Sequence, residues 1–230
     1  MIRCPIFFFV CIAIAFNQTP DDRGYIVTIA EKSPDFILDF PDGSQTSLAN
    51  LKGQVTLLQF TASWCHVCRK EMPYIEKEIW KVYKNTGLNV IGIDRDESAD
   101  VVAKFAKEVQ ITYPLALDKG ADVFALFADR NSGVTRNVVI APDGSIVFLT
   151  RLFEIQEFNK MKRVIHNLLI DQLREQKNSL IAKKQIINKM KKQQSRSDRY
   201  FTRKLETELY KTERELKRKE RKLTLAQKRL

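Results

Sequence analysis

Cysteine and histidine are scarce in this sequence. Its 230 residues include 4 Cys and 2 His, whereas small folds held together by disulfides contain far more cysteine. An apolar fraction of 44% is enough for an ordinary hydrophobic core without such staples. A structural zinc site takes four ligands, and the chain offers one close pair, Cys65 and Cys68, together with His66 and His166. This scarcity argues against a disulfide scaffold and against a metal site, and we expect no cofactor.

Long hydrophobic runs are also absent. The run from Pro5 to Phe16 is too short to cross a bilayer as a helix, and no other stretch comes close. It follows the basic Arg3 and ends near the small-residue site Ala13-Ile14-Ala15, an order typical of a secretory signal peptide. We expect a signal peptide over residues 1–15 and a mature protein in the periplasm or cell envelope. The alternative is a buried N-terminal strand, or a stub left by a misplaced start codon.

Cleavage of that signal peptide would leave two thiols in the mature protein. Cys4 and Cys11 lie in the segment that would be removed, so Cys65 and Cys68 would remain. A lipid-modified cysteine follows a Leu-x-small triplet, and the residues before Cys11 fit that pattern poorly, which disfavours a lipid anchor. The pair would then be the whole thiol chemistry of the molecule.

Negative charge is scarce only in the C-terminal part of the chain. From residue 171 onward there are 20 Lys and Arg against 8 Asp and Glu, while the preceding residues contain 19 and 20. The net charge of +11 therefore belongs to the tail, and the sequence predicts two modules. We place a linker at residues 16–32, a folded domain at 33–172 and a basic helical extension at 173–230.

The tail from residue 176 contains no Gly, Pro or Trp and is rich in good helix formers. Apolar residues recur every seven positions in two registers, with Ser195–Asp198 between them as an expected break. The companion positions of the later register are poor partners for a coiled-coil seam. This argues against a tight zipper and favours a long basic helix that frays or binds a partner. The two registers are Leu173, Leu180 and Ile187, then Leu209, Leu216, Leu223 and Leu230.

Residues 33–172 show the alternation of an α/β fold. Continuous apolar runs indicate strands buried on both faces, and Asp42-Gly43 marks a hairpin turn. Pro114 would interrupt the hydrogen bonds of a central strand, so we expect an edge strand around it. The order β-α-β-α-β-β-α predicts a parallel core with an antiparallel hairpin at one edge. The expected elements are strands at 55–60, 88–94, 113–117, 137–141 and 146–151, and helices at 65–84, after Ser98, at 121–129 and at 154–173.

Cys65 directly follows a buried strand and opens the next helix. Unpaired N–H groups and the helix dipole favour a negative charge at that place, which lowers the pKa of the first thiol and makes it a nucleophile. The spacing puts Cys68 one turn along, where its thiol can attack a mixed disulfide and release the product. A purely structural bond between the two would close too small a loop to add much stability. The pair is therefore predicted to cycle between dithiol and disulfide.

Two residues next to the cysteine pair, His66 and Trp64, each allow two interpretations of their role. His66 adds positive charge near Cys65 and pushes the couple toward oxidising power, or it is an exposed loop residue with little effect. Trp64 packs over the active-site loop, or it fills the core. Pro73 lies eight residues into the helix and is expected to kink it.

These residues make the stretch from Ser33 to Leu169 resemble the TlpA/ResA-like thiol–disulfide oxidoreductases of the bacterial envelope. The resemblance implies a thioredoxin-like three-layer α/β/α sandwich with a mixed sheet, to which the long helical tail is added. It implies that Cys65 is the exposed nucleophile and Cys68 the resolving thiol. It also implies that Glu71 tunes the pair or contacts substrate, the alternative being a solvated acid on the helix surface. The matching pieces are Pro34-Asp35-Phe36, the Asp42-Gly43 turn, Leu48–Gly53 and above all ASWCHVCRKEMP at Ala62–Pro73.

Two positions near the pair depart from the family pattern. The family's cis-proline aligns with Thr135, and a cis bond before a non-proline residue is costly. We therefore expect a trans peptide there, with Thr135 and Arg136 still beside Cys65. The buried acid of the thioredoxins, six residues before the first cysteine, is replaced by Gln59. A proton relay to the resolving thiol would then need water or Glu71.

The sequence thus predicts a thiol–disulfide oxidoreductase that reduces disulfide-bearing exported proteins and takes electrons from a membrane thiol donor. A peroxiredoxin-like peroxidase has the same fold but needs a Pro-x-x-x-Thr-x-x-Cys run. Gln54–Leu58 contains no proline, and Thr61 lies four residues before Cys65, so this function is the second choice.

A third hypothesis makes the tail the functional part of an envelope binding protein. Basic residues beside Tyr200 and Phe201 are typical of a nucleic-acid surface, but export argues against nucleic acid as the partner. An anionic envelope surface or an acidic partner would then be the target. The plain alternative is a solvated helical extension without a binding function.

Overall fold

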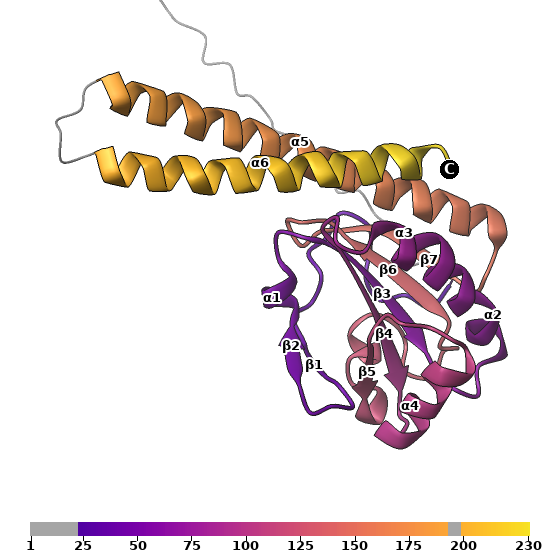
Figure 1. Ribbon diagram of the computed structural model, residues 1–230. Coiled ribbons are helices and arrows are strands. Elements are labelled where there is room, and N and C mark those ends of the chain that lie inside the picture. The colour runs from indigo at the N-terminus through magenta and orange to yellow at the C-terminus, as the bar shows by residue number, and fades with distance from the viewer. Residues whose placement is uncertain (1–22, 193–198) are drawn as a thin grey trace, which may run out of the picture.

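The computed structural model describes residues 23–192 and 199–230 (Figure 1). The expected signal peptide, the first part of the linker and the break at Ser195–Asp198 lie outside the described residues. The described chain forms an α/β sandwich from which a hairpin of two long helices extends (Figure 1). This agrees with the predicted fold class.

A mixed sheet of seven strands forms the centre of the sandwich, in the order β2-β1-β5-β4-β3-β6-β7. β3 and β4 are parallel and pair along their length, and both are buried, which confirms the predicted core. β6 and β7 form the predicted antiparallel hairpin at one edge. The strands are β1 (Ile37–Asp39), β2 (Gln45–Ser47), β3 (Val55–Thr61), β4 (Leu88–Arg95), β5 (Leu115–Asp118), β6 (Arg136–Ile140) and β7 (Ile146–Arg151).

The expectation that the strand at Pro114 forms an edge is wrong. β5 pairs with β4 on one side and, through Leu117 and Asp39, with β1 on the other. Pro114 lies just before the strand, so its missing N–H breaks no ladder bond, and its carbonyl accepts the N–H of Gly92 at 2.9 Å. The hairpin of β1 and β2 takes the edge position instead.

Side chains of β3 alternate between two layers. Gln59 contacts Glu71 in the helix that follows the cysteine pair. Phe60 points the other way, into a layer where the rings of Phe124 and Phe127 lie 5.4 and 5.3 Å from its own. The sheet is therefore covered on both faces, as the continuous apolar run of β3 predicts.

One helical segment follows the cysteine pair without a break. It consists of α2 (His66–Tyr74), the π-helical η1 (Ile75–Trp80) and α3 (Lys81–Tyr83). Pro73 lies inside α2, and the wide π-helical turn begins two residues later, so the loss of the proline N–H is absorbed in this turn. The remaining short helices are α1 (Leu48–Leu51), α4 (Ala99–Glu108) after Ser98, and two 3-10 turns, η2 (Lys119–Ala121) and η3 (Phe124–Leu126), in place of the expected helix at 121–129.

The C-terminal helices form an antiparallel hairpin. α5 (Ile155–Lys192) runs without a break through residues 172 and 173, and α6 (Arg199–Gln227) returns along it (Figure 1). Apolar side chains of both predicted registers meet in the seam, where Leu180, Leu216 and Leu223 are 7%, 4% and 1% exposed. Of the two alternatives for the tail, fraying is therefore wrong, and the partner that each helix binds is the other helix of the hairpin. The two helices pack through one row of apolar side chains each, and Lys–Glu ion pairs beside this row add to the contact between them.

The hairpin and the sandwich share one hydrophobic core. Ala226, near the end of α6, is buried in the same cluster as Tyr83 of α3 and Leu169 of α5. Nζ of Lys222 donates to the carbonyl of Lys84 at 3.4 Å. The hairpin is thus joined to the sandwich at the end of α3. No described helix is both long and apolar enough to cross a membrane.

Truncation of a seam leucine tests this packing. We expect Leu216→Ala to lower the free energy of unfolding by about 2 kcal/mol, because a buried leucine loses its contacts between the two helices. Leu225 lies on the same helix but is 60% exposed, so Leu225→Ala is the matched control and should cost less than about 0.5 kcal/mol. Urea denaturation followed by far-ultraviolet circular dichroism measures both. Identical curves for the two variants would contradict the seam.

Candidate active site

The cysteine pair lies at the junction of β3 and α2. β3 ends at Thr61, and Cys65 caps the N-terminus of α2. The sulfur of Cys65 accepts the backbone N–H of Cys68 at 3.2 Å. At this place the helix dipole and the unpaired N–H groups favour a thiolate, as the sequence predicts.

Cys65 and Cys68 are joined by a disulfide, with their Cα atoms 5.3 Å apart. The two sulfurs differ in access from solvent, because Cys65 is 7% exposed and Cys68 is completely buried. An incoming thiol or disulfide therefore meets Cys65 first. The opening residues of α2 thus present one sulfur and cover the other.

The loop before β6 brings Thr135 against both sulfurs. The hydroxyl of Thr135 lies 3.1 Å from Sγ of Cys65 and 3.3 Å from Sγ of Cys68. The described residues contain no cis peptide bond, so Thr135 has the expected trans peptide. Its side chain places a hydroxyl, which both donates and accepts hydrogen bonds, between the two reacting atoms.

Arg136 does not share that position. Successive residues of a strand point to opposite faces, and the guanidinium of Arg136 lies over the rings of Tyr25 and Phe124, at 5.1 and 5.3 Å. The side chain is buried and donates to the carbonyl of Arg23 at 2.7 Å. Arg136 therefore fastens the N-terminal segment on the face away from Cys65, and the expectation that it lies beside the pair is corrected by the alternation of β6.

Trp64 and His66 face solvent on either side of Cys65. Trp64 is 65% exposed and His66 is exposed too, so the indole does not fill the core. The loop that carries Trp64 is held in place, because Glu97 accepts both the N–H and the hydroxyl of Ser63 at 2.5 Å. Nε of Arg69 also donates to the Ser63 carbonyl at 2.6 Å. A fixed loop thus presents an exposed aromatic ring beside the disulfide.

A buried carboxyl lies on the face of α2 that carries Cys68. Glu71 follows Cys68 by three residues and is 1% exposed, so it is not a solvated surface acid. It accepts hydrogen bonds from Nε2 of Gln59 at 3.0 Å and from Nδ2 of Asn137 at 2.7 Å. Burial raises the pKa of Glu71 to about 7, and the two amide hydrogen bonds offset only part of that effect. This carboxyl therefore exchanges a proton near neutral pH.

The partners of Glu71 were not identified from the sequence. The hydroxyl of Tyr113 donates to Oε1 of Gln59 at 2.6 Å, and Nδ2 of Asn137 also donates to Oγ1 of Thr150 at 2.8 Å. A signal for them does exist. Gln59 and Asn137 interrupt strands that are otherwise apolar, and a polar side chain inside a buried strand needs hydrogen-bond partners.

His166 takes no part in this site. It lies in α5, where its Nδ1 is 3.3 Å from the hydroxyl of Tyr83 and burial lowers its pKa. The described part of the chain contains no group of three His, Cys, Asp or Glu side chains that could hold a metal ion.

The sequence is similar to one protein family and to several proteins named thiol-disulfide oxidoreductase ResA. Residues 29–149 match the model of the AhpC/TSA family. A thiol-disulfide oxidoreductase ResA from Bacillus cereus is 29% identical over 152 residues, which cover 64% of this chain and 84% of the relative. ResA from Bacillus thuringiensis subsp. konkukian is 30% identical over 132 residues, covering 55% of this chain and 74% of the relative.

Solved structures support the fold. A solution structure from Bacteroides thetaiotaomicron, described as a candidate protein disulfide isomerase, is 54% identical with a TM-score of 0.62, covering 64% of this chain and 92% of that one. A structure from Chlorobium tepidum, described as a candidate thiol:disulfide interchange protein DsbE, is 24% identical with a TM-score of 0.56, covering 62% and 99%.

Motif, geometry and relatives agree on the class of activity. Cys65 and Cys68 are the redox-active couple of a thiol–disulfide oxidoreductase, and the sandwich that carries them is thioredoxin-like. The family model matches more than half of the chain and includes both cysteines. The protein is a member of the AhpC/TSA family.

Proposed function

We propose that the protein reduces disulfides of exported proteins in the periplasm or cell envelope and is reduced again by a membrane thiol donor. The observation that carries the direction is the surroundings of the Cys65 sulfur. Its hydrogen-bond partners in the described chain are the N–H of Cys68 and the hydroxyl of Thr135, both uncharged. Strong oxidants of this kind owe their potential to a stabilised reduced form, and two neutral partners stabilise a thiolate only moderately. Export is supported by the signal-peptide pattern at Pro5–Phe16.

The reaction is a pair of thiol–disulfide exchanges. The Cys65 thiolate attacks one sulfur of the substrate disulfide, that bond breaks, and the other substrate sulfur leaves and takes a proton. Cys68 then loses its proton and attacks the Cys65 sulfur, which releases the second substrate thiol and closes the Cys65–Cys68 disulfide. Two electrons have moved to the substrate. A dithiol donor reverses the same steps to restore the reduced pair.

Glu71 is the base for the second exchange in this mechanism. Cys68 is buried and cannot give its proton directly to solvent. Glu71 lies on the same face of α2, and its pKa of about 7 lets it accept a proton at neutral pH and release it afterwards. Glu71 thus accepts the proton of the resolving thiol, a role that Gln59 cannot fill because its side chain does not ionise.

Thr135 serves both exchanges. Its hydroxyl is within hydrogen-bond reach of each sulfur, so it can donate to the Cys65 thiolate before the first attack. It can then accept the S–H of Cys68 while that thiol waits to resolve the mixed disulfide. A hydrogen bond to a charged acceptor is stronger than one to a neutral acceptor, which favours the thiolate of Cys65.

The peroxidase alternative has weak support from the site. The threonine before the first cysteine is Thr61, and its hydroxyl donates to Sδ of Met72 at 3.4 Å. It thus lies against the core and not beside Cys65, where a peroxide would have to bind. A peroxide-consumption assay on the reduced protein separates the two activities.

The reduction potential of the couple tests the direction of electron flow. We expect a value of about −250 mV or lower, measured by alkylation and intact mass in graded redox buffers. A value above about −180 mV would overturn the reductase proposal in favour of an oxidase or isomerase.

Single cysteine variants test the separate roles of the two sulfurs. Cys68→Ser should accumulate a stable mixed disulfide at Cys65 when it meets a protein disulfide, because the resolving thiol is absent. Cys65→Ser should show neither turnover nor trapping, since the remaining thiol is buried. Trapping by Cys65→Ser would contradict the roles proposed for the two sulfurs.

Replacement of Glu71 by glutamine tests the buried base. The rate of the second exchange should rise with pH through about 7 in the wild type, because the carboxylate is the form that accepts the proton. Glu71→Gln should lose this inflection and be at least about tenfold slower above it. Stopped-flow tryptophan fluorescence of single turnovers measures the rate. The same inflection in the variant would refute the role of Glu71.

The carboxyl of Glu71 also affects the free energy of unfolding, which should fall with rising pH, whereas the rate of the second exchange should rise. Folding raises the pKa of Glu71 from 4.5 to about 7, so between these values the folded state holds more protons than the unfolded state. Stability of the wild type should therefore fall as pH rises through this window. Glu71→Gln should lack this contribution to the slope in denaturation curves measured across it.

Substitution of Thr135 tests the role of its hydroxyl. Thr135→Val keeps the shape of the side chain and removes the hydrogen bonds, so it should raise the pKa of the Cys65 thiol by about one. Thr135→Ser keeps the hydroxyl and should restore the wild-type value. The pH dependence of alkylation of the reduced protein measures all three. Equal pKa values in the valine and serine variants would show that the hydroxyl has no such role.

A further inference from the structure

Three of the five glutamates of α6 lie at its seam with α5. These three glutamates recur every seven residues, so they lie on one side of the helix. Each of them pairs with a lysine of α5, and those lysines recur with the same spacing. Because these acids face α5, they neutralise few of the other cations of α6; among the described residues, Glu213 also pairs with Lys217 of α6 at 3.3 Å. The pairs are Lys191–Glu206, Lys184–Glu213 and Lys177–Glu220.

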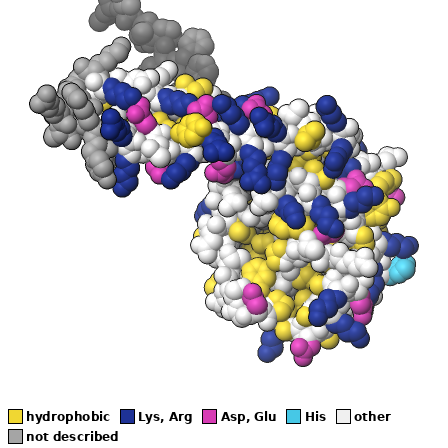
Figure 2. Space-filling view, in the orientation of Figure 1, with side chains coloured by type: hydrophobic (Ala, Val, Ile, Leu, Met, Phe, Trp, Pro, Cys, Tyr) yellow, Lys and Arg dark blue, Asp and Glu magenta, His cyan; other side chains and the backbone are white. Residues whose placement is uncertain are grey.

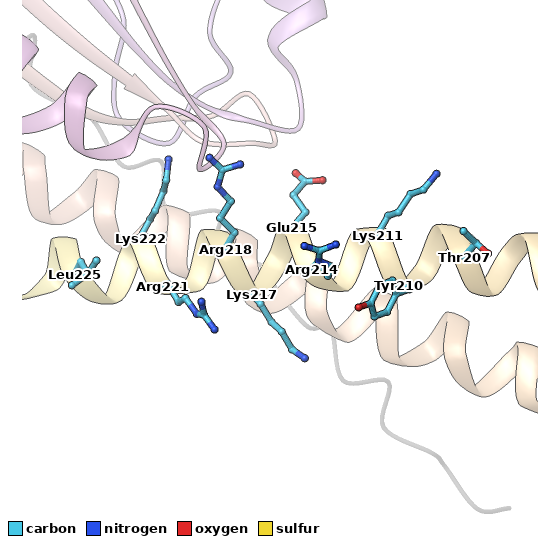
Figure 3. A pocket seen from close by; sticks show the side chains of 10 residues that line it. All are labelled: Thr207, Tyr210, Lys211, Arg214, Glu215, Lys217, Arg218, Arg221, Lys222 and Leu225. Atoms are coloured by element: carbon cyan, nitrogen blue, oxygen red, sulfur yellow. The ribbon is translucent and has the colours of Figure 1, made fainter.

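The remaining surface of α6 is strongly basic. Six cationic side chains lie within about three turns of the helix and line a hollow along it, in which Glu215 is the sole acid among the described lining residues (Figure 3). Figure 2 shows Lys and Arg side chains gathered along the hairpin and over its junction with the sandwich. We call these six residues the basic face of α6: Lys211, Arg214, Lys217, Arg218, Arg221 and Lys222.

Two exposed apolar residues flank the basic face. Tyr210 is 62% exposed and lies at one end of the hollow, and Leu225, 60% exposed, lies at the other (Figure 3). The guanidinium of Arg214 lies 6.0 Å from the centre of the Tyr210 ring. Two cations of the face are already paired on the same helix, Lys211 with Glu208 at 2.9 Å and Lys217 with Glu213 at 3.3 Å. Within the described residues, neither Arg218 nor Arg221 forms an ion pair. The face thus combines free cations with apolar groups at its ends.

We propose that the basic face of α6 binds an anionic lipid surface. Arginine guanidinium groups pair with phosphate oxygens through two parallel hydrogen bonds. Juxtaposed Lys and Arg side chains attract anionic headgroups, while an exposed tyrosine and leucine enter the boundary between headgroups and acyl chains. A single open helix surface suits a flat layer of phosphates better than the shaped site that a folded acidic protein would need.

The attachment of the hairpin orients the active site away from such a surface. α6 meets the sandwich at α3, through Ala226 and through Lys222. Lys222 is the last cation of the basic face and donates to the Lys84 carbonyl, so the other five cations of the face are the ones proposed to contact lipid. Cys65 lies at the other end of the continuous helical segment from His66 to Tyr83, a length of roughly 27 Å at 1.5 Å per residue. Lipid bound along α6 therefore leaves Cys65 and Trp64 open to a protein substrate. The hairpin would hold the enzyme at the surface without covering its sulfur.

Vesicle binding by the full chain tests the proposal. We expect the protein to co-sediment with vesicles of phosphatidylglycerol and phosphatidylcholine but not with phosphatidylcholine alone, and to be released by salt. The triple variant Arg214→Gln, Arg218→Gln and Arg221→Gln should lose about 100-fold in its partition coefficient, given the contribution of each basic side chain near an anionic membrane.

A matched variant removes the same charge from the sandwich. Lys104→Gln, Lys107→Gln and Lys119→Gln change three exposed lysines on α4 and η2, and this variant should bind like the wild type within about threefold. Disulfide reduction in solution should be equal in all three proteins, which shows that each is folded. The test therefore separates lipid binding from the proposed redox function.

Three results would overturn the lipid proposal. Wild-type binding by the arginine variant would show that the basic face is not the contact. An equal loss in the lysine variant would assign binding to net charge alone. Failure of the wild-type protein to bind anionic vesicles at low salt would exclude a lipid surface and leave an acidic protein as the partner to seek.

Discussion

The hydrogen bond from the N–H of Cys68 to the sulfur of Cys65 is the interaction on which the active site depends. It forms only if α2 begins at His66, so that Cys65 caps the helix with its sulfur instead of continuing it. The position of the first residue of α2 depends on the loop before it. Glu97 and Arg69 fix this loop through hydrogen bonds to Ser63. The rigidity of β3, buried along its whole length, then fixes the loop to the sheet. Reactivity of one sulfur thus rests on the packing of the central strand.

Polar side chains inside a buried strand need hydrogen-bond partners. In this site the same burial also gives one carboxyl, that of Glu71, a pKa at which it can accept and release a proton near neutral pH. Glu71 loses contact with water, which raises its pKa into the neutral range. Gln59 and Asn137 keep the carboxyl hydrogen-bonded in place, and Tyr113 fixes the amide of Gln59 in turn. An isolated buried acid would destabilise the fold without being held in a defined position. The network therefore holds an ionisable group one turn from Cys68.

Sequence patterns predicted what is local and missed what depends on distant partners. The role of the cysteine pair, the parallel core and the trans peptide at Thr135 follow from neighbouring residues and from backbone chemistry. Arg136 was misplaced because its face is set by the alternation of β6 against β3, which no local motif records. The strand after Pro114 was assigned to an edge because nothing nearby shows that β1 pairs beyond it. The companion positions of the later register are poor for a coiled-coil seam, so the sequence did not predict the packing of the hairpin, in which α5 supplies lysines opposite the glutamates of α6.

Stability and surface charge of the hairpin come from the same choice of residues. A basic tail would repel itself as a pair of adjacent helices unless its few acids lay between them, and the seven-residue spacing of Glu206, Glu213 and Glu220 puts them there. Acids placed at the seam neutralise little of the outer surface of α6, where Glu213 reaches Lys217 alone among the described cations of the basic face. The arrangement that lets two cationic helices pack together therefore also leaves Arg218 and Arg221 available to an anionic partner. Leu216 and Leu223, buried between the helices, keep that surface rigid and set its direction relative to the sandwich.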